Sequence, residues 1–168
     1  MFYTQFFLKI EYIFIGVVFI ALSVLGVNFY NSYAFKHNPL PKSYIQKIEK
    51  KEQEILGNMQ KNIGVSYEFS LVITDKISGR LYGLTSYENG VITIYLNKKV
   101  MQESMKYILS DVIAHEYAHA LLFEQHRYTN HEDGHSLLWK KTCKLLGGKD
   151  CKRYVNQEEI IMSKMPFH

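Results

Sequence analysis

The sequence has 168 residues, of which 47% are hydrophobic and 21% charged, with a formal net charge of +4. This length allows one domain plus an appendage. The positive excess is small, and most Lys and Arg residues are interspersed with Glu. The composition therefore argues against a nucleic-acid-binding surface, and we expect no nucleic-acid partner.

The appendage lies at the N-terminus. No charged residue occurs from position 12 to position 35, and residues 12–27 (YIFIGVVFIALSVLGV) are almost wholly apolar. With Phe6, Phe7 and Leu8 before them, they give about 20 residues of helix, enough for a hydrocarbon core about 30 Å thick. Phe and Tyr gather at both ends of the segment, as in the interfacial belts of membrane helices.

A cleaved signal peptide would give a similar apolar segment. A signal peptide begins with a positively charged region, but in this chain Lys9 is offset by Glu11. The best small-residue cleavage site, which ends at Ala34, also lies far from the N-terminus for a signal peptide. We therefore predict an uncleaved, single-pass anchor over residues 1–35 that contacts membrane lipid, followed by one domain over residues 36–168.

The domain begins with a predicted amphipathic helix. Pro39 and Pro41 end the membrane segment, and Ser43 with Gln46 fits a capping box at the helix start. Apolar residues then recur at helical spacing up to Gly64: Ile45, Ile48, Ile55, Leu56, Met59 and Ile63. The charged run KIEKKEQE of this helix faces either water or, beside a membrane, anionic headgroups.

Three strands are expected next. Residues 66–74 alternate apolar with polar side chains, and residues 81–87 and 91–96 flank Asn89-Gly90, the strongest short hairpin signal. We predict a small, largely antiparallel sheet. Residues 91–96, just before the next helix, are our candidate for an edge strand that aligns an extended peptide by main-chain pairing. The alternative is a purely structural hairpin.

The motif that carries chemistry is HEYAH. Two histidines four apart on a helix stand one turn above each other, so His115 and His119 can reach one metal ion, with Glu116 turned towards the same site. Zn²⁺ binds neutral imidazole nitrogens at about 2.0–2.1 Å and keeps an open position for water. A carboxylate beside that water can take its proton and pass it to the leaving amine, which is the chemistry of a zinc peptidase.

The motif lies in a helix predicted over residues 104–123. The inward-facing stripe of this helix contains both histidines and the apolar residues Ile108, Val112 and Leu122. Two hydrogen-bonded core histidines are the structural alternative, but a pair that flanks a glutamate on a buried stripe favours metal binding. Asp111, one turn before His115, either accepts a hydrogen bond from its ring or is a solvated helix charge.

A catalytic zinc needs a third protein ligand, and the sequence offers several. The candidates are His126, His131, Glu132, Asp133, His135, Glu158 and Glu159. His126 lies one residue too far from His119 for the HExxHxxGxxH arrangement. His135 would lie in the first turn of a helix predicted over residues 134–146 and capped by Asp133, and a helix mounts a ligand more rigidly than a loop.

These motifs together resemble those of the SprT-like metallopeptidase family. The family pattern is HExxH followed by H-G-x-x-[FW]-K and a helix, and this chain has HEYAH, a loop of modest length, and then HSLLWK from His135 to Lys140. The resemblance covers roughly residues 91–148. Ser136 stands where the family pattern has glycine.

The resemblance implies a zincin-type α+β fold and endopeptidase activity with one zinc ion. It assigns the zinc ligands to His115, His119 and His135, the catalytic role to Glu116, and a packing role to Trp139. The chain has no C-terminal cysteine zinc ribbon. Because of this and of the membrane anchor, we do not transfer the DNA–protein crosslink role of some eukaryotic relatives.

The chain has two cysteines, and their spacing bears on location. Cys143 lies in the last turns of the predicted second helix and Cys151 follows the reversal at Gly147, so a disulfide is geometrically possible, with two free thiols as the alternative. A bridge would place the domain outside the reducing cytosol. The lysines that follow the span favour the cytoplasm. Because these lysines also belong to an amphipathic helix, we predict an extracytoplasmic domain.

The sequence thus predicts an α+β protein: a transmembrane helix, then a zincin-like domain of one helix, a short mostly antiparallel sheet, a metal-binding helix and a second packing helix. The predicted function is a membrane-anchored zinc endopeptidase acting on proteins or peptides, with Glu116 as general base to a zinc-activated water. The alternatives are a catalytically silent, zinc-stabilised protein-binding module at the membrane and a metal-free scaffold. Candidates for oxyanion stabilisation are Tyr87, Tyr117, His126 and Tyr128.

Overall fold

The computed structural model describes residues 2–77, 81–127 and 134–153, with side chains from residue 11 onwards. The chain divides into two compact units, Met1–Pro39 and Leu40–His168. The first unit is an apolar helix. In the second unit, the described residues form the other helices and a mixed three-stranded sheet. The α+β fold class expected from the sequence is confirmed.

Helix α1 (Phe2–His37) is apolar through most of its length. Within Glu11–His37 the mean hydropathy reaches 2.3, and the side chains of this segment are largely exposed. By length and composition, this helix could cross a membrane. It extends ten residues past the predicted apolar core at residues 12–27, because no helix-breaking residue occurs before Pro39.

Helix α2 (Lys42–Ile63) packs one face on the domain, with Ile48, Ile55 and Met59 buried as their spacing predicts. The capping box predicted at Ser43 is wrong. The residue at the N-cap is Pro41, two residues earlier, and the helix begins at Lys42. The φ of Pro41, −57°, already suits a helix start, and its side chain forms no capping bond. At the other end, Gly64 adopts the left-handed conformation with φ 80°, which closes the helix.

The sheet consists, in the described ranges, of β1 (Ser70–Thr74), β2 (Gly83–Glu88) and β3 (Val91–Asn97), in the order β1-β3-β2. Strand β3 pairs parallel with β1 and antiparallel with β2. The sheet is therefore mixed rather than largely antiparallel. The first strand also begins later than expected, because its ladder with β3 starts only where Ser70 faces Thr93.

The hairpin between β2 and β3 has the predicted turn. Asn89 and Gly90 have φ values of 52° and 80°, which a two-residue hairpin turn of type I′ needs. The prediction that β3 is an edge strand is wrong, because β1 pairs with its second edge. In the described part of the chain, β2 is the strand that contacts the motif helix and has a strand partner on one side only.

The helix predicted over residues 104–123 is helical but not one regular α-helix. Helix α3 (Lys98–Tyr107) continues into a π-helical turn, η1 (Ile108–Val112), and then into α4 (Ile113–Glu124). Ser104 departs from helical geometry, with φ −126° and ψ 18°. A π-turn loosens the regular hydrogen-bond ladder of a helix and is often found at functional sites.

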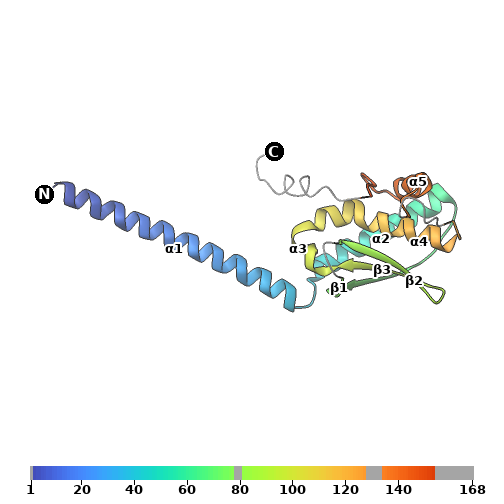
Figure 1. Ribbon diagram of the computed structural model, residues 1–168, viewed down its shortest axis with the longest axis horizontal. Helices are drawn as coiled ribbons and strands as arrows, with labels where there is room; N and C mark the ends of the chain where they lie inside the picture. The colour runs from blue at the N-terminus through green and yellow to red at the C-terminus, as the bar shows by residue number, and fades with distance from the viewer. Residues whose placement is uncertain (1, 78–80, 128–133, 154–168) are drawn as a thin grey trace. The chain divides into compact units, whose positions relative to one another are not determined.

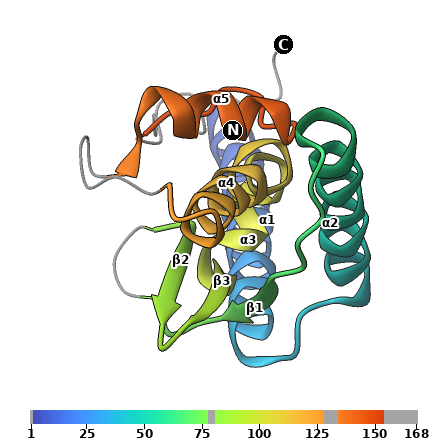
Figure 2. The ribbon, with the colours of Figure 1, turned by 90° about the vertical axis from the view of Figure 1, so that its right-hand side faces the viewer.

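Helix α4 occupies the centre of the second unit. One side of α4 packs on β2 and β3, while α2 and α5 (Leu137–Leu145) pack on its other sides, as Figure 1 and the end-on view in Figure 2 show. The inward-facing residues of β3 are Ile92, Ile94 and Leu96, all buried. The sheet and two helices thus enclose the helix that carries the HEYAH motif.

Helix α5 is shorter than the predicted span of residues 134–146. It begins at Leu137, and Ser136 caps it by accepting a hydrogen bond from the Trp139 N–H at 3.3 Å. The predicted cap, Asp133, lies outside the described residues.

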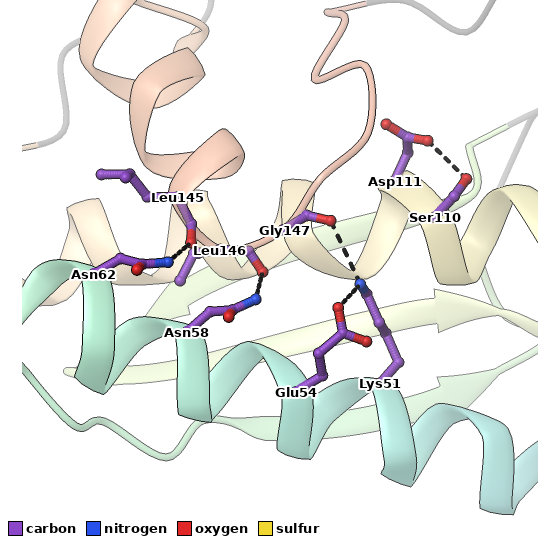
Figure 3. Close-up of polar contacts among 9 residues, drawn as sticks. All are labelled: Lys51, Glu54, Asn58, Asn62, Ser110, Asp111, Leu145, Leu146 and Gly147. Atoms are coloured by element: carbon purple, nitrogen blue, oxygen red, sulfur yellow. Dashed lines mark hydrogen bonds and ion pairs between the residues drawn. The ribbon is translucent and has the colours of Figure 1, made fainter.

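The C-terminal end of α5 is held by side chains of α2 (Figure 3). Three donors reach three consecutive carbonyl oxygens: Asn62 to Leu145 at 2.8 Å, Asn58 to Leu146 at 3.1 Å and Lys51 to Gly147 at 3.4 Å. Carbonyls at a helix end have no partner within the helix, so these bonds satisfy them and dock α5 on α2.

A disulfide joins Cys143 to Cys151, with their Cα atoms 6.0 Å apart, so the cysteines are bridged and not free. A Cβ at Gly148 would lie 2.6 Å from each sulfur. The bridge therefore requires glycine at this position.

The segment before Cys151 docks on η1. The Ser110 carbonyl accepts from the Lys149 N–H at 3.0 Å, and Oδ1 of Asp111 accepts from the N–H groups of Asp150 at 2.5 Å and Cys151 at 3.3 Å. The Ser110 hydroxyl donates to the other carboxylate oxygen at 2.7 Å (Figure 3). Both expectations for Asp111 were therefore wrong, because this buried carboxylate binds a distant stretch of backbone.

Candidate metal centre

Three imidazole rings converge beside α4. The Nε2 atoms of His115 and His119 lie 3.3 Å apart, and Nε2 of His135 lies 3.1 Å from the first and 3.3 Å from the second. His115 and His119 come from one face of α4, as their spacing predicts. His135 comes from the segment just before α5 and not, as predicted, from the first turn of that helix.

The triangle of nitrogens has the size that a metal ion needs. Around a tetrahedral zinc ion with nitrogens at about 2.0–2.1 Å, neighbouring ligand atoms lie about 3.3–3.4 Å apart. Hydrogen bonds alone do not explain the triangle, because each ring nitrogen is either a donor or an acceptor and one of the three pairs is then mismatched. These three histidines could therefore hold a metal ion.

Burial keeps two of these rings neutral. Burial, together with the charge of the neighbouring imidazoles, lowers the pKa of His115 to about 4 and that of His119 to about 3, and the charge of Asp111 opposes the shift at His115. A metal ion binds the neutral imidazole, so protons compete weakly for this site at neutral pH.

Trp139 forms the floor of the cluster. Its ring centroid lies 4.6, 5.3 and 4.5 Å from those of His115, His119 and His135, and its indole N–H donates to the His115 carbonyl at 3.4 Å. The side chain is only 1% exposed. This tryptophan therefore fixes the ring orientations and keeps water from one side of the cluster, in the packing position that the family resemblance implies.

Glu116 is buried on the side of α4 that faces β2. The Thr85 hydroxyl lies 2.8 Å from Oε2 of Glu116 and 3.0 Å from its backbone carbonyl oxygen. Burial raises the pKa of the Glu116 carboxyl to about 7, although the hydrogen bonds from Thr85 oppose the shift. A carboxyl group that titrates near neutral pH can both take and return a proton.

Sequence reasoning missed two residues of β2 that shape this site. One is Thr85, and the other is Gly83, where a Cβ would lie 2.9 Å from both Cγ and Oε1 of Glu116. A glycine inside a strand often marks the close approach of another group, which was the available signal. The partner of that approach could not be identified without the packing of β2 on α4.

The other candidate ligands do not join this cluster in the described part of the chain. His126 is exposed in the turn after α4, with φ 52°. His131, Glu132, Asp133, Glu158 and Glu159 lie outside the described residues.

Among the oxyanion candidates, Tyr117 is buried and its hydroxyl donates to Glu52 of α2, and burial raises its pKa. Tyr87 is 49% exposed and stacks on Phe123 with ring centroids 5.7 Å apart. Tyr128 lies outside the described residues. Tyr87 therefore retains a hydroxyl close to solvent, whereas Tyr117 serves to join α2 and α4.

Comparison with models of protein families shows to which family the chain belongs. The model of the SprT-like family matches residues 44–159, which include most of α2 and all of the sheet, α4 and α5. The chain belongs to the SprT-like family. A search of curated proteins finds no match to this chain. In this SprT-like protein, the serine at the position of the family glycine, Ser136, supplies the side-chain cap of α5 directly after His135.

Proposed function

We propose that this SprT-like protein is a zinc-dependent endopeptidase. The observation that carries the proposal is the triangle of Nε2 atoms from His115, His119 and His135, 3.1–3.3 Å apart, beside a buried carboxyl on the same turn of helix. Three histidines leave a fourth position of a tetrahedral ion open, as catalytic zinc sites do. Zinc bound there would supply a Lewis acid that polarises a peptide carbonyl and acidifies a water molecule.

Glu116 is the proposed general base. Its carboxylate takes a proton from the attacking water and then, as a carboxylic acid, gives it to the nitrogen of the leaving amine. Burial raises the pKa of this carboxyl and so favours the protonated form that donates to the leaving amine. Trp139 limits water around the imidazoles, and Thr85 holds the carboxyl group.

The proposed substrate is an extended protein segment or peptide. The strand proposed to align it is β2, because β3 is paired on both edges and, of the two outer strands, β2 carries the Thr85 contact to Glu116. A segment added to the edge of β2 that has no strand partner among the described residues would run past the catalytic carboxyl. Nucleic acid is not part of the proposal, since the net charge of +4 is spread among acidic residues.

We further propose that α1 anchors the enzyme in a membrane and that the catalytic unit lies outside the cytoplasm. The apolar segment Glu11–His37 supports the anchor, and the bridge between Cys143 and Cys151 supports an oxidising compartment. Thiol labelling of intact cells tests this location. We expect labelling of both cysteines only after reduction, whereas free thiols reached only by a membrane-permeant reagent would place the unit in the cytoplasm.

The Glu116→Gln variant tests the catalytic proposal. Glutamine keeps the size of the side chain and cannot act as a base, so cleavage of an unfolded protein should fall by orders of magnitude while zinc content stays unchanged. Glu124→Gln, an exposed position at the end of α4, is the matched control and should cleave like the wild type. Equal cleavage by Glu116→Gln and wild type would place the chemistry elsewhere.

A further inference from the structure

Strand β2 supplies contacts that orient the Glu116 side chain, and the HEYAH motif itself contains none of them. One hydroxyl, that of Thr85, lies within hydrogen-bond distance of both the carboxyl group and the backbone carbonyl of Glu116, at 2.8 and 3.0 Å. The Thr85 hydroxyl thus lies between the backbone carbonyl and the side-chain carboxyl of Glu116. A glutamate has several rotatable bonds, and this double contact selects one arrangement among many.

Gly83, two residues earlier, clears the space that this arrangement needs. A Cβ at Gly83 would lie 2.9 Å from Cγ and from Oε1 of Glu116, and 3.0 Å from a methyl group of Val112. Real Cβ atoms essentially never lie this close to another heavy atom, so a side chain at residue 83 would displace the Glu116 side chain. The carboxyl group can therefore lie against β2 only because residue 83 has no side chain.

The strand that presents these two residues is itself firmly held. Gly83 and Thr85 face Leu96 and Ile94 in the antiparallel ladder, and both β3 residues are fully buried. Ahead of the strand, the buried Asn97 side chain donates to the Leu81 carbonyl at 2.7 Å. A catalytic group is positioned well when the residue that holds it lies on such an element of regular structure.

We propose that Thr85 is a positioning residue for Glu116, and that Gly83 provides the clearance it requires. Thr85 does not touch the substrate in this role. It holds the carboxyl group in the rotamer from which proton transfer occurs, so its loss lowers the rate of the chemical step and leaves substrate binding unchanged. This inference rests on the proposed peptidase function, because it assigns Thr85 a role through the base.

The test compares Thr85→Val with Thr85→Ser in the full chain, purified in detergent. Valine keeps the shape and strand preference of threonine and removes the hydroxyl, whereas serine keeps the hydroxyl and removes a methyl group. We expect Thr85→Val to lower kcat by about 10- to 100-fold with KM and zinc content unchanged, because misplacing a catalytic group by about 1 Å has effects of this size. Thr85→Ser should restore most of the rate.

Two further measurements separate positioning from packing. Thr93→Val changes a threonine on the opposite face of the sheet and should leave kcat unchanged. In a crystal structure of Thr85→Val, the Glu116 carboxyl group should leave its place against β2, and Gly83→Ala should displace the same group. These structural readouts do not depend on activity.

The outcomes are distinct from those of the peptidase proposal. If wild type and Glu116→Gln cleave equally, the peptidase proposal fails. If Glu116→Gln is inactive but Thr85→Val keeps the wild-type kcat, or Thr85→Ser loses as much as Thr85→Val, the positioning role is overturned. A Thr85→Val structure in which Glu116 has not moved overturns it as well.

Discussion

Two consecutive turns of the central helix are held in place by different means. The turn of α4 with His115, Glu116 and His119 is fixed by side chains: the ring of His135, the Trp139 indole and the Thr85 hydroxyl. The π-turn before it, η1, is fixed by backbone. Its Ser110 carbonyl and Asp111 carboxylate accept N–H groups of the segment that the disulfide closes.

The α4 turn therefore provides the metal-binding groups, whereas the contacts of η1 stabilise the fold around them. Residues of the α4 turn have the chemistry of a metal site, whereas the Ser110 carbonyl and the Asp111 carboxylate of η1 accept hydrogen bonds from the backbone of residues 149–151. Damage to the first turn should therefore remove metal and leave the fold, and damage to the second should lower stability and leave metal binding. Four variants or conditions test this division, in order of decreasing expected effect.

The largest effect is expected from the histidines. His119→Ala leaves two nitrogens, and two ligands hold zinc poorly against its hydration, so affinity should fall by orders of magnitude. His115→Ala and His135→Ala should behave alike, while His126→Ala, an exposed histidine two residues after α4, should bind like the wild type. Zinc titration with a chromophoric chelator measures this, and full occupancy in His135→Ala would remove that residue from the site.

The disulfide should matter for stability and not for metal. The bridged residues are 8 positions apart, and closing so short a loop stabilises a fold by about 2–3 kcal/mol. The double variant Cys143→Ala/Cys151→Ala should lose about this much in denaturation of the metal-free protein, with one zinc per chain still bound after metal is restored. Loss of zinc stoichiometry in this variant would show that the two turns are not independent.

Asp111 should have a smaller effect. Asp111→Ala removes the acceptor of two backbone N–H groups in a buried place, which costs about 1–2 kcal/mol. Asp111→Asn keeps an acceptor oxygen of the same reach and should recover part of this loss. Thermal unfolding of the two variants checks the prediction, and equal stabilities would show that these hydrogen bonds do not hold the segment.

Lowering the pH of the metal-free protein by one unit should have an effect no larger than that of Asp111→Ala. Because the pKa values of His115 and His119 are lowered to about 4 and about 3 in the fold, below pH 6.5 the unfolded chain binds protons that the folded chain does not, and stability falls on acidification. The raised pKa of Glu116 acts in the opposite direction between pH 4.5 and about 7, where the folded chain holds the extra proton.

Between pH 6.5 and 4.5, the stability lost through the two histidines is larger than the stability gained through Glu116. The net loss should therefore grow towards about 1.4 kcal/mol per pH unit as the pH falls from 6.5 to 4.5. Chemical denaturation across this range measures it. Stability that is constant or that rises on acidification would contradict the assigned environments, and Glu116→Gln should make the loss steeper.

The same division explains how much of the protein could be predicted. The apolar helix, the hairpin at Asn89-Gly90 and the histidines of HEYAH depend on neighbours in the sequence, so local patterns indicate them. His135 lies 16 residues after His119, and its convergence with His115 and His119 followed from a family pattern. The α+β class followed from the order of these elements.

The parts that were missed depend on contacts between distant segments. Asp111 accepts hydrogen bonds from residues about 40 positions later, and no local pattern marks such an acceptor. The roles of Gly83 and Thr85 follow from the packing of β2 on α4. The place of β3 in the sheet could not be known from the sequence, because a parallel partner such as β1 has no hairpin signal.

X-ray absorption of the zinc-loaded protein tests the central claim most directly, because it reports the atoms bound to the ion. We predict one zinc per chain with three imidazole nitrogens at about 2.0–2.1 Å and one further light-atom ligand. The signal should remain the same in Glu116→Gln, and in His135→Ala it should show one imidazole fewer once enough zinc is added to fill the weakened site. A sulfur ligand, or a wild-type spectrum with fewer than three imidazoles, would contradict the account.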